Sequence, residues 1–419
     1  MLEIFETATS IWMTWWVFRA LSLMRRGRRD SILPVSLVFY FMYVVPVMCD
    51  LYVGHPGYSR EPGFIQSSED TKVRIIYCIF LIFTSIIWRS AGQLCTQYHQ
   101  VSLKKSNAIT RLVWICVALN PIILLAFVPD LKVFIEYGTV AKESISQASV
   151  PYVGAMGLAT TAAVIASAMF VCISRNIMLS FLASLPLIVV SIWLNGKRAI
   201  VAVAIISMLM ALYLRRQLLG HKLIIAFTFA ISLLAGFSYF YQNHIRGLGT
   251  KSETKEQLYE DARIDYGRET RVKMAIFYEL YPNGRKILDY RGQSLLFLAT
   301  SFIPRNYWPD KPYPYAVYFT SAMLHVPSKD IGWGMTTEVF DEAISNFGWL
   351  GFLTGPGLII WICRTGDSRS SASIKIVTVF IASMLLSVQL AAFLPVFGIW
   401  IVLIIRTKRV SLSRHYVRC

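Results

Sequence analysis

Long runs of hydrophobic residues alternate with short polar segments along most of this chain. The runs are roughly 17 to 25 residues long, the length at which an α-helix rising 1.5 Å per residue crosses a hydrocarbon core of about 30 Å. A membrane β-barrel would instead alternate apolar and polar positions. The pattern therefore predicts an all-α polytopic membrane protein.

About eleven runs are candidates for transmembrane helices, and the expected range is ten to twelve because Pro395 and Gly398 interrupt the end of the pattern. The predicted spans are approximately 5–24, 32–53, 73–89, 109–128, 151–173, 177–193, 199–214, 223–241, 347–363, 374–391 and 393–405. Acidic residues precede the first run and basic residues follow it, which is the reverse of a signal peptide. We therefore expect an uncleaved first span.

One long polar segment, residues 242–345, interrupts the hydrophobic pattern. It separates a bundle of about eight helices in 1–241 from the last helices and basic tail in 346–419. It contains a helix-like stretch, 255–280, and an apolar run, 295–303, that is too short to span a membrane and is expected at the interface. A segment of this length is seldom a mere linker, so we expect function to reside here.

Composition and charge agree with this description. The chain is 55% hydrophobic and only 16% charged, and its mean hydropathy is +0.53. The net charge of +17 comes from short basic clusters between the runs, such as 25–29, 104–105 and 215–216. That distribution is the positive-inside pattern and argues against nucleic-acid binding. It places the long segment outside and the C-terminus in the cytoplasm.

The first candidate site is a tight turn, Asn195-Gly196-Lys197-Arg198, between two apolar runs. Glycine permits the turn, and two cations at the start of a helix suit an anion such as a lipid phosphate. The alternative is simple anchoring of the helical hairpin at the interface.

The second candidate lies in the long segment. It comprises Arg291 and the stretch 304–312, in which Arg305, Trp308 and Lys311 stand among three prolines. Aromatic faces stack on sugar rings, and Arg and Lys bind phosphate or carboxylate. The alternative is an interfacial aromatic belt in which Arg305 pairs with the nearby Asp310.

The third candidate is an acidic cluster immediately before a membrane span. Glu338 and Glu342 are four residues apart and would share a helical face, with Asp341 close by and Asn346 one turn further on. Carboxylates near an interface are suited to acid or base catalysis. A solvated helix cap explains the same pattern without catalysis. Motifs for ATP, nicotinamide or metal-dependent sugar-nucleotide chemistry are absent from the sequence, as are CxxC pairs of the kind that bind zinc.

Together these segments resemble the Wzy-type O-antigen polymerases, which polymerise oligosaccharide repeat units. In that family a polytopic chain has one large late periplasmic loop with a Pro-Arg-x-x-Trp-Pro-x-Lys-Pro-like segment, similar to 304–312. The loop closes with a Glu…Asn-Phe-Gly stretch, similar to 338–351. A Gly-x-Arg-type turn also resembles 196–198.

The resemblance implies a glycosyltransferase fold of the GT-C type in the bacterial inner membrane. The implied pathway is the biosynthesis of lipopolysaccharide or a related polysaccharide. The implied substrates are oligosaccharide repeat units carried on undecaprenyl pyrophosphate. The growing chain is transferred to a new lipid-linked unit with release of undecaprenyl pyrophosphate. No cofactor or metal is expected, and a chain-length-regulating co-polymerase is the expected protein partner.

These implied roles assign residues as follows. Glu338 is the first choice for the base, then Glu342 or Asp341, and Arg305 stabilises the leaving group. The residues expected to bind substrate are Lys197, Arg198, Arg291, Trp308, Lys311 and Asn346. Two alternatives remain open: an O-antigen ligase, which transfers glycan to lipid A core and typically uses a histidine, and a flippase of lipid-linked oligosaccharide.

Overall fold

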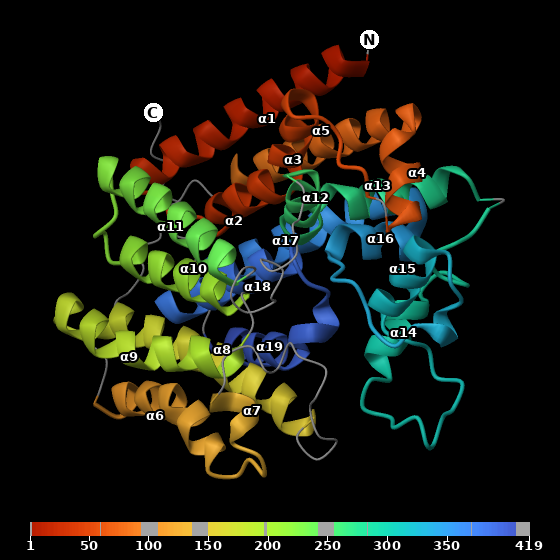
Figure 1. Ribbon diagram of the computed structural model, residues 1–419. Coiled ribbons are helices and arrows are strands. Elements are labelled where there is room, and N and C mark those ends of the chain that lie inside the picture. Colours follow the sequence, from red (N-terminus) through yellow and green to blue (C-terminus); the bar gives the residue numbers. More distant parts are fainter. Residues whose placement is uncertain are drawn as a thin grey trace.

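The computed structural model describes residues 2–58, 60–93, 108–135, 150–196, 199–241, 255–282, 284–369 and 371–407. These residues form helices and connecting turns, with no β-strand among them (Figure 1). Six helical stretches in this part of the chain are long and apolar enough to cross a membrane. The prediction of a helical membrane protein is therefore confirmed.

The six candidate spans are Ile32–Tyr52, Thr71–Arg89, Tyr152–Ile173, Ile177–Asn195, His221–Phe240 and Val339–Asp367. Shorter apolar helices are Arg111–Leu125, Ile200–Leu214, Tyr315–Leu324, Ala372–Leu385 and Val396–Arg406. Helix α1 (Leu2–Arg25) coincides with the first predicted run but is not among the six, because threonine, serine and charged side chains interrupt its apolar sequence.

The helices that build the bundle, in chain order, are α1, α2 (Ile32–Phe39), the π-helix η1 (Tyr40–Val44), α3 (Val45–Tyr52), α5 (Thr71–Gln93), α6 (Ala108–Leu125), α7 (Lys132–Ile135), α8 (Val150–Ile173), α9 (Ile177–Asn195), α10 (Ala199–Leu214), α11 (His221–Phe240), α17 (Gly351–Asp367), α18 (Ala372–Leu385) and α19 (Leu394–Arg406). The long polar segment contains α12 (Lys255–Tyr266), α13 (Glu269–Leu280), α14 (Gln293–Ala299), α15 (Tyr315–Leu324) and α16 (Val339–Phe347), and α4 (Pro62–Glu69) packs with it. In Figure 1 this second group gathers at one end of the bundle.

The opposite end of the bundle, here called the basic end, collects four turns that are far apart in sequence. The Tyr213 hydroxyl at the end of α10 donates to the Met24 carbonyl of α1 at 3.2 Å. The Arg215 guanidinium donates to the Cys172 carbonyl of α8, also at 3.2 Å. Lys375 of α18 donates to the Arg29 carbonyl. The arginine clusters of the predicted cytoplasmic loops therefore meet in one place.

The other end, here called the loop end, is joined to the bundle by polar contacts. Arg74 at the start of α5 pairs with Glu6 of α1 at 2.7 Å. The Tyr281 hydroxyl donates to Asp70 at 2.7 Å. The Tyr281 hydrogen bond fixes the polar segment against the residue that precedes α5, and the Arg74–Glu6 pair joins α5 to α1.

A π-helical turn connects the second helical stretch to the polar segment. Pro46 has no N–H to donate to the Met42 carbonyl four residues earlier. Such a gap in the helical ladder is typical of π-turns, and η1 lies at this point. The freed Met42 carbonyl accepts a hydrogen bond from the Arg268 backbone N–H at 2.9 Å.

Phe340 anchors α16 in the bundle. Its ring lies 5.2 Å from those of Tyr43 and Phe80 and 5.8 Å from that of Phe39, in edge-to-face geometry. The Phe340 side chain is fully buried. The helix that carries the predicted acids is thus held by the hydrophobic core, not by the loop alone.

Two local predictions need correction. The stretch 255–280 is two helices, because the chain breaks at Gly267 between α12 and α13, where an added Cβ would lie 2.7 Å from the Arg263 carbonyl oxygen. Glu338 and Glu342 do not share a helical face, because Glu338 is the extended N-cap residue of α16. Its φ of −132° and ψ of −176° turn it away from the helical register.

Candidate functional site

Glu338 is a buried acid between two buried guanidinium groups. Its Oε2 lies 3.9 Å from Arg271 Nε and 4.0 Å from Arg268 Nε. Neither Glu338 carboxylate oxygen has a hydrogen-bond partner among the described residues, and its side chain is 0% exposed. Burial raises the pKa of Glu338 well above its ordinary value. Repulsion from Asp341 adds to this rise, and Arg271 and Arg268 oppose it.

Arg271 holds this region together through backbone carbonyls. Its guanidinium donates to the carbonyls of Thr336 at 2.6 Å, Gly267 at 2.6 Å and Ile264 at 2.8 Å. These three acceptors come from the end of α12, the turn before α13, and the strand-like entry to α16. One side chain therefore ties together three parts of the polar segment.

A second ionic cluster links α12 and α13 to Asp50 of α3. Arg263 donates to Asp50 Oδ1 at 2.7 Å and also pairs with Glu269. Lys273 approaches Asp50 Oδ2 at 3.2 Å, and the His55 ring lies 3.4 Å from the same oxygen. The two helices are thus locked to the end of α3 by buried charge pairs.

Sequence reasoning missed this group of buried cations and their partner Asp50. The signal was present in the stretch 263–273, where three arginines and a lysine fall within three helical turns. Such a run normally marks a solvated helical face. Here Arg263, Arg268, Arg271 and Lys273 are at most 8% exposed. Only the fold shows that acids from α3 and α16 converge on them.

Asp341 caps α16. Its Oδ1 accepts hydrogen bonds from the backbone N–H groups of Glu338 and Glu342, both at 2.9 Å. The Glu338 N–H is one of the groups that the first turn of a helix leaves without partners, whereas the Glu342 N–H also donates to the Glu338 carbonyl at 3.3 Å. The helix-cap interpretation therefore describes Asp341 correctly, but the cap is buried, not solvated.

Glu342 and Asn346 lie against the start of α14. Ser294 donates its hydroxyl to Glu342 Oε1 at 2.7 Å, and the Asn346 side-chain amide donates to the Ser294 oxygen at 2.7 Å. The Asn346 Oδ1 atom is buried and has no partner among the described residues. Glu342 is the one predicted acid that keeps partial exposure.

Arg291, which lies just before α14, contacts the C-terminal half of α16. It donates to the carbonyls of Ile344 at 3.2 Å and Ser345 at 2.8 Å, and it pairs with Glu279 at 2.5 Å. Its side chain is still 54% exposed. Residues 291–294 thus contact both halves of α16, and we call Arg291, Ser294, Glu342 and Asn346 the α14–α16 site.

Gly348 makes room for this arrangement. An added Cβ there would lie 3.2 Å from Arg291 Nη2 and 2.9 Å from Glu279 Oε1. The residue also has φ of +63°, a conformation that favours glycine. The predicted Asn-Phe-Gly stretch therefore contains one residue whose missing side chain is a geometric requirement.

A cleft of about 180 Å³ opens beside the α14–α16 site. Its lining combines exposed cations, acids and tyrosines with the end of α16: Ala275, Tyr278, Glu279, Pro282, Lys286, Ile287, Leu288, Asp289, Tyr290, Arg291 and Ser345. Tyrosine rings and paired polar groups are suited to binding sugars, and Lys286 and Arg291 are suited to binding an anion.

The proline-rich stretch forms a loop with its own internal contacts. Arg305 donates to the carbonyls of Lys311 at 2.8 Å and Pro312 at 3.0 Å, and it stacks over the Tyr313 ring at 4.2 Å. Lys311 donates to the Ile303 carbonyl at 2.9 Å. These two cations stabilise the loop, and within the described residues Arg305 bonds to carbonyls instead of Asp310.

The remaining predicted residues are placed as follows. Trp308 is half-buried in the same loop, where its backbone N–H donates to the Arg305 carbonyl at 3.2 Å. Lys197 and Arg198 lie outside the described residues. The preceding Gly196 caps α9 in the left-handed conformation, and its carbonyl accepts a hydrogen bond from the Tyr241 hydroxyl at 3.2 Å.

The fold and this site define a helical membrane protein with a structured polar segment attached to one end of its bundle. Comparison of the chain with protein-family models, with curated proteins and with solved structures finds no match.

Proposed function

We propose that the chain is a membrane glycosyltransferase of the repeat-unit polymerase type, with its reaction centre at the α14–α16 site. The observation that carries the proposal is the convergence of residues 291–294 on both halves of α16. This convergence combines an exposed guanidinium, a partly exposed carboxylate and a tyrosine-lined cleft on the loop end. The supporting argument from sequence is the resemblance of 304–312 and 338–351 to the Wzy-type family.

In the proposed topology the loop end faces the periplasm of a bacterial inner membrane and the basic end faces the cytoplasm. About eleven helices then cross the membrane in a bundle of the GT-C type. The gathering of arginines from four turns at the basic end supports this orientation.

The proposed reaction breaks a glycosyl diphosphate bond and forms a glycosidic bond. A carboxylate removes the proton from an acceptor hydroxyl at the non-reducing end of a lipid-linked unit. The hydroxyl oxygen then bonds to the anomeric carbon of the growing chain. The bond from that carbon to undecaprenyl pyrophosphate breaks, and the diphosphate leaves with the electron pair.

The structure changes the order of preference for the base. Glu338 has no exposed surface and Asp341 is engaged in capping, whereas Glu342 is partly exposed and oriented by Ser294. We therefore assign Glu342 as the base. Arg291 is assigned to the departing diphosphate, where each charge-assisted hydrogen bond contributes about 1.5–3 kcal/mol. We assign Glu338, Arg268 and Arg271 as positioning residues that hold the start of α16 in place.

The test is the surface-glycan ladder of a strain that lacks this gene. Loss of a polymerase leaves core plus one repeat unit, and the wild-type chain restores the ladder, whereas Glu342→Gln and Arg291→Gln do not. Bare core with lipid-linked polymer would instead indicate a ligase. Lipid-linked single units trapped on the inner face would indicate a flippase. Either outcome would refute the proposal.

A further inference from the structure

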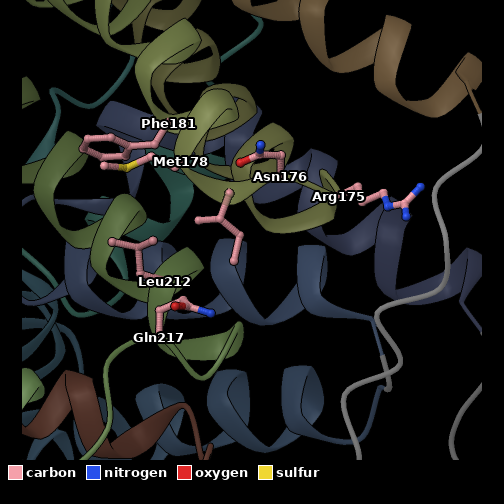
Figure 2. Close-up of a pocket in the computed structure, with 7 residues that line it drawn as sticks. Arg175, Asn176, Met178, Phe181, Leu212 and Gln217 are labelled. Carbon is pink, nitrogen blue, oxygen red and sulfur yellow. The ribbon is translucent and has the colours of Figure 1, made fainter.

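A second cavity lies at the basic end, remote in the fold from the α14–α16 site. It has a volume of about 850 Å³ and is lined by Arg175, Asn176, Ile177, Met178, Phe181, Leu212 and Gln217. Figure 2 shows Met178, Phe181 and Asn176 on one side and Leu212 and Gln217 on the other, with Arg175 extending away at the rim. The cavity therefore lies between the start of α9 and the end of α10.

The surroundings of this cavity are strongly cationic. The turns 25–31, 172–177, 212–222 and 364–376 contain eleven Lys and Arg residues, and their acids are Asp30 and Asp367. Both acids are already engaged: Asp30 pairs with Arg28 at 2.5 Å, and Asp367 binds Lys375 at 3.2 Å and the Ser31 backbone N–H at 2.9 Å. An anion from outside the chain would relieve the excess positive charge.

The close approach of these cations also affects the pKa of Arg29. Burial lowers the pKa of Arg29, and the neighbouring charge of Arg216 lowers it further. The Arg175 side chain has no ion pair or hydrogen bond with the described residues. This end of the bundle therefore has cations available for an external anion.

The walls of the cavity are apolar and continue onto the outer surface of α9. Met178 is 70% exposed, and Leu179 and Leu182 on the same helix are 66% and 53% exposed. Exposed apolar side chains on a membrane-spanning helix face lipid chains. The cavity is thus open to acyl chains on one side and to the cationic turns on the other.

We propose that this cavity binds an anionic phospholipid, with the headgroup phosphate at Arg175 and an acyl chain along Met178 and Phe181. Asn176 Oδ1 accepts the Leu179 N–H at 3.2 Å to cap α9, which leaves its amide N–H groups to donate to phosphate. The Gln217 carboxamide supplies further donors from the facing turn. Basic pockets between transmembrane helices on the cytoplasmic side are suited to such headgroups.

The test is native mass spectrometry of the purified full-length chain, titrated with phosphatidylglycerol or phosphatidylcholine of identical acyl chains. The wild-type chain is expected to bind the first phosphatidylglycerol more tightly than phosphatidylcholine. Arg175→Gln should weaken this binding about fivefold, the effect of one interfacial cation. The matched control Lys222→Gln removes one charge from the exposed surface of the same end and should change binding less than twofold.

A second variant tests whether the lipid lies at the mouth of this cavity. Met178→Glu places an anion at the cavity mouth without disturbing buried packing, because Met178 is largely exposed, and it should abolish the preference for phosphatidylglycerol. Equal effects of Arg175→Gln and Lys222→Gln would overturn the proposal. Displacement of the lipid by millimolar inorganic phosphate would also overturn it, because the site would then take a free anion.

Discussion

Replacing Arg271 by methionine tests the account of the buried centre of the polar segment. The guanidinium is 2% exposed and donates to three carbonyls, those of Thr336, Gly267 and Ile264. Methionine has similar length but no donor, so the three carbonyls lose their partner and one charge near Glu338 disappears.

The expected cost follows from these contacts. Removing one member of a buried ionic and hydrogen-bonded group typically destabilises a protein by about 3–5 kcal/mol. For a chain of this size we expect the melting temperature to fall by about 5 °C or more. Arg291→Met is the matched control, because Arg291 is 54% exposed and its ion pair with Glu279 should contribute less than about 1 kcal/mol.

The assay is thermal unfolding of both variants in the same detergent, followed by intrinsic tryptophan fluorescence. Arg271→Met should unfold well below the wild type, and Arg291→Met should unfold close to it. A melting temperature of Arg271→Met within about 1 °C of the wild type would refute the assignment of Arg271 as the tie between α12, α13 and α16.

Three further predictions concern backbone room, pH and the proline-rich loop. Gly348→Ala should displace the Arg291–Glu279 pair and reduce glycan chain length in the ladder assay. The control Gly284→Ala should not, because its added Cβ lies 3.5 Å from its nearest atom. Equal ladders from the two variants would contradict the role of Gly348. Because the pKa of Glu338 is raised in the folded chain, the unfolded chain releases this proton first, so its contribution to stability is present at low pH and is lost as pH rises. Glu338→Gln should therefore gain stability relative to the wild type as pH increases from 5 to 9, and a difference in melting temperature that is constant with pH would disprove this. Arg305→Ala should make residues 301–312 more sensitive to limited proteolysis, because two carbonyl hydrogen bonds and the Tyr313 contact are lost. The control Lys329→Ala, at an exposed residue, should not have this effect. Identical digestion rates of the two variants would contradict the role of Arg305 in stabilising the loop.

The hydrophobic pattern predicted the helical membrane character of the fold because spans have a fixed length in a bilayer. It also separated the polar segment from the bundle. It could not show the break at Gly267, because both sides of the break have helical periodicity. Nor could it show the π-turn, whose cause is a single proline at position 46 and whose partner, Arg268, lies far away in sequence.

The candidate site was predicted unevenly for similar reasons. The acids before α17 were found because three carboxylates fall within five residues beside an apolar run. Their different environments were not found, because the partners of these acids lie far away in sequence: Glu338 lies near Arg268 and Arg271, and Glu342 accepts a hydrogen bond from Ser294. Arg305 and Lys311 attracted attention as cations among aromatics, but their partners are carbonyls within ten residues of each, which residue type alone does not reveal.

The most direct test of the proposed function uses the purified chain in liposomes with lipid-linked repeat units extracted from the deletion strain, in the presence of a metal chelator. We predict polymer formation with release of one undecaprenyl pyrophosphate for each bond formed, and loss of both products in Glu342→Gln. Absence of polymer with the folded wild-type chain, or equal polymer from Glu342→Gln, would contradict the account.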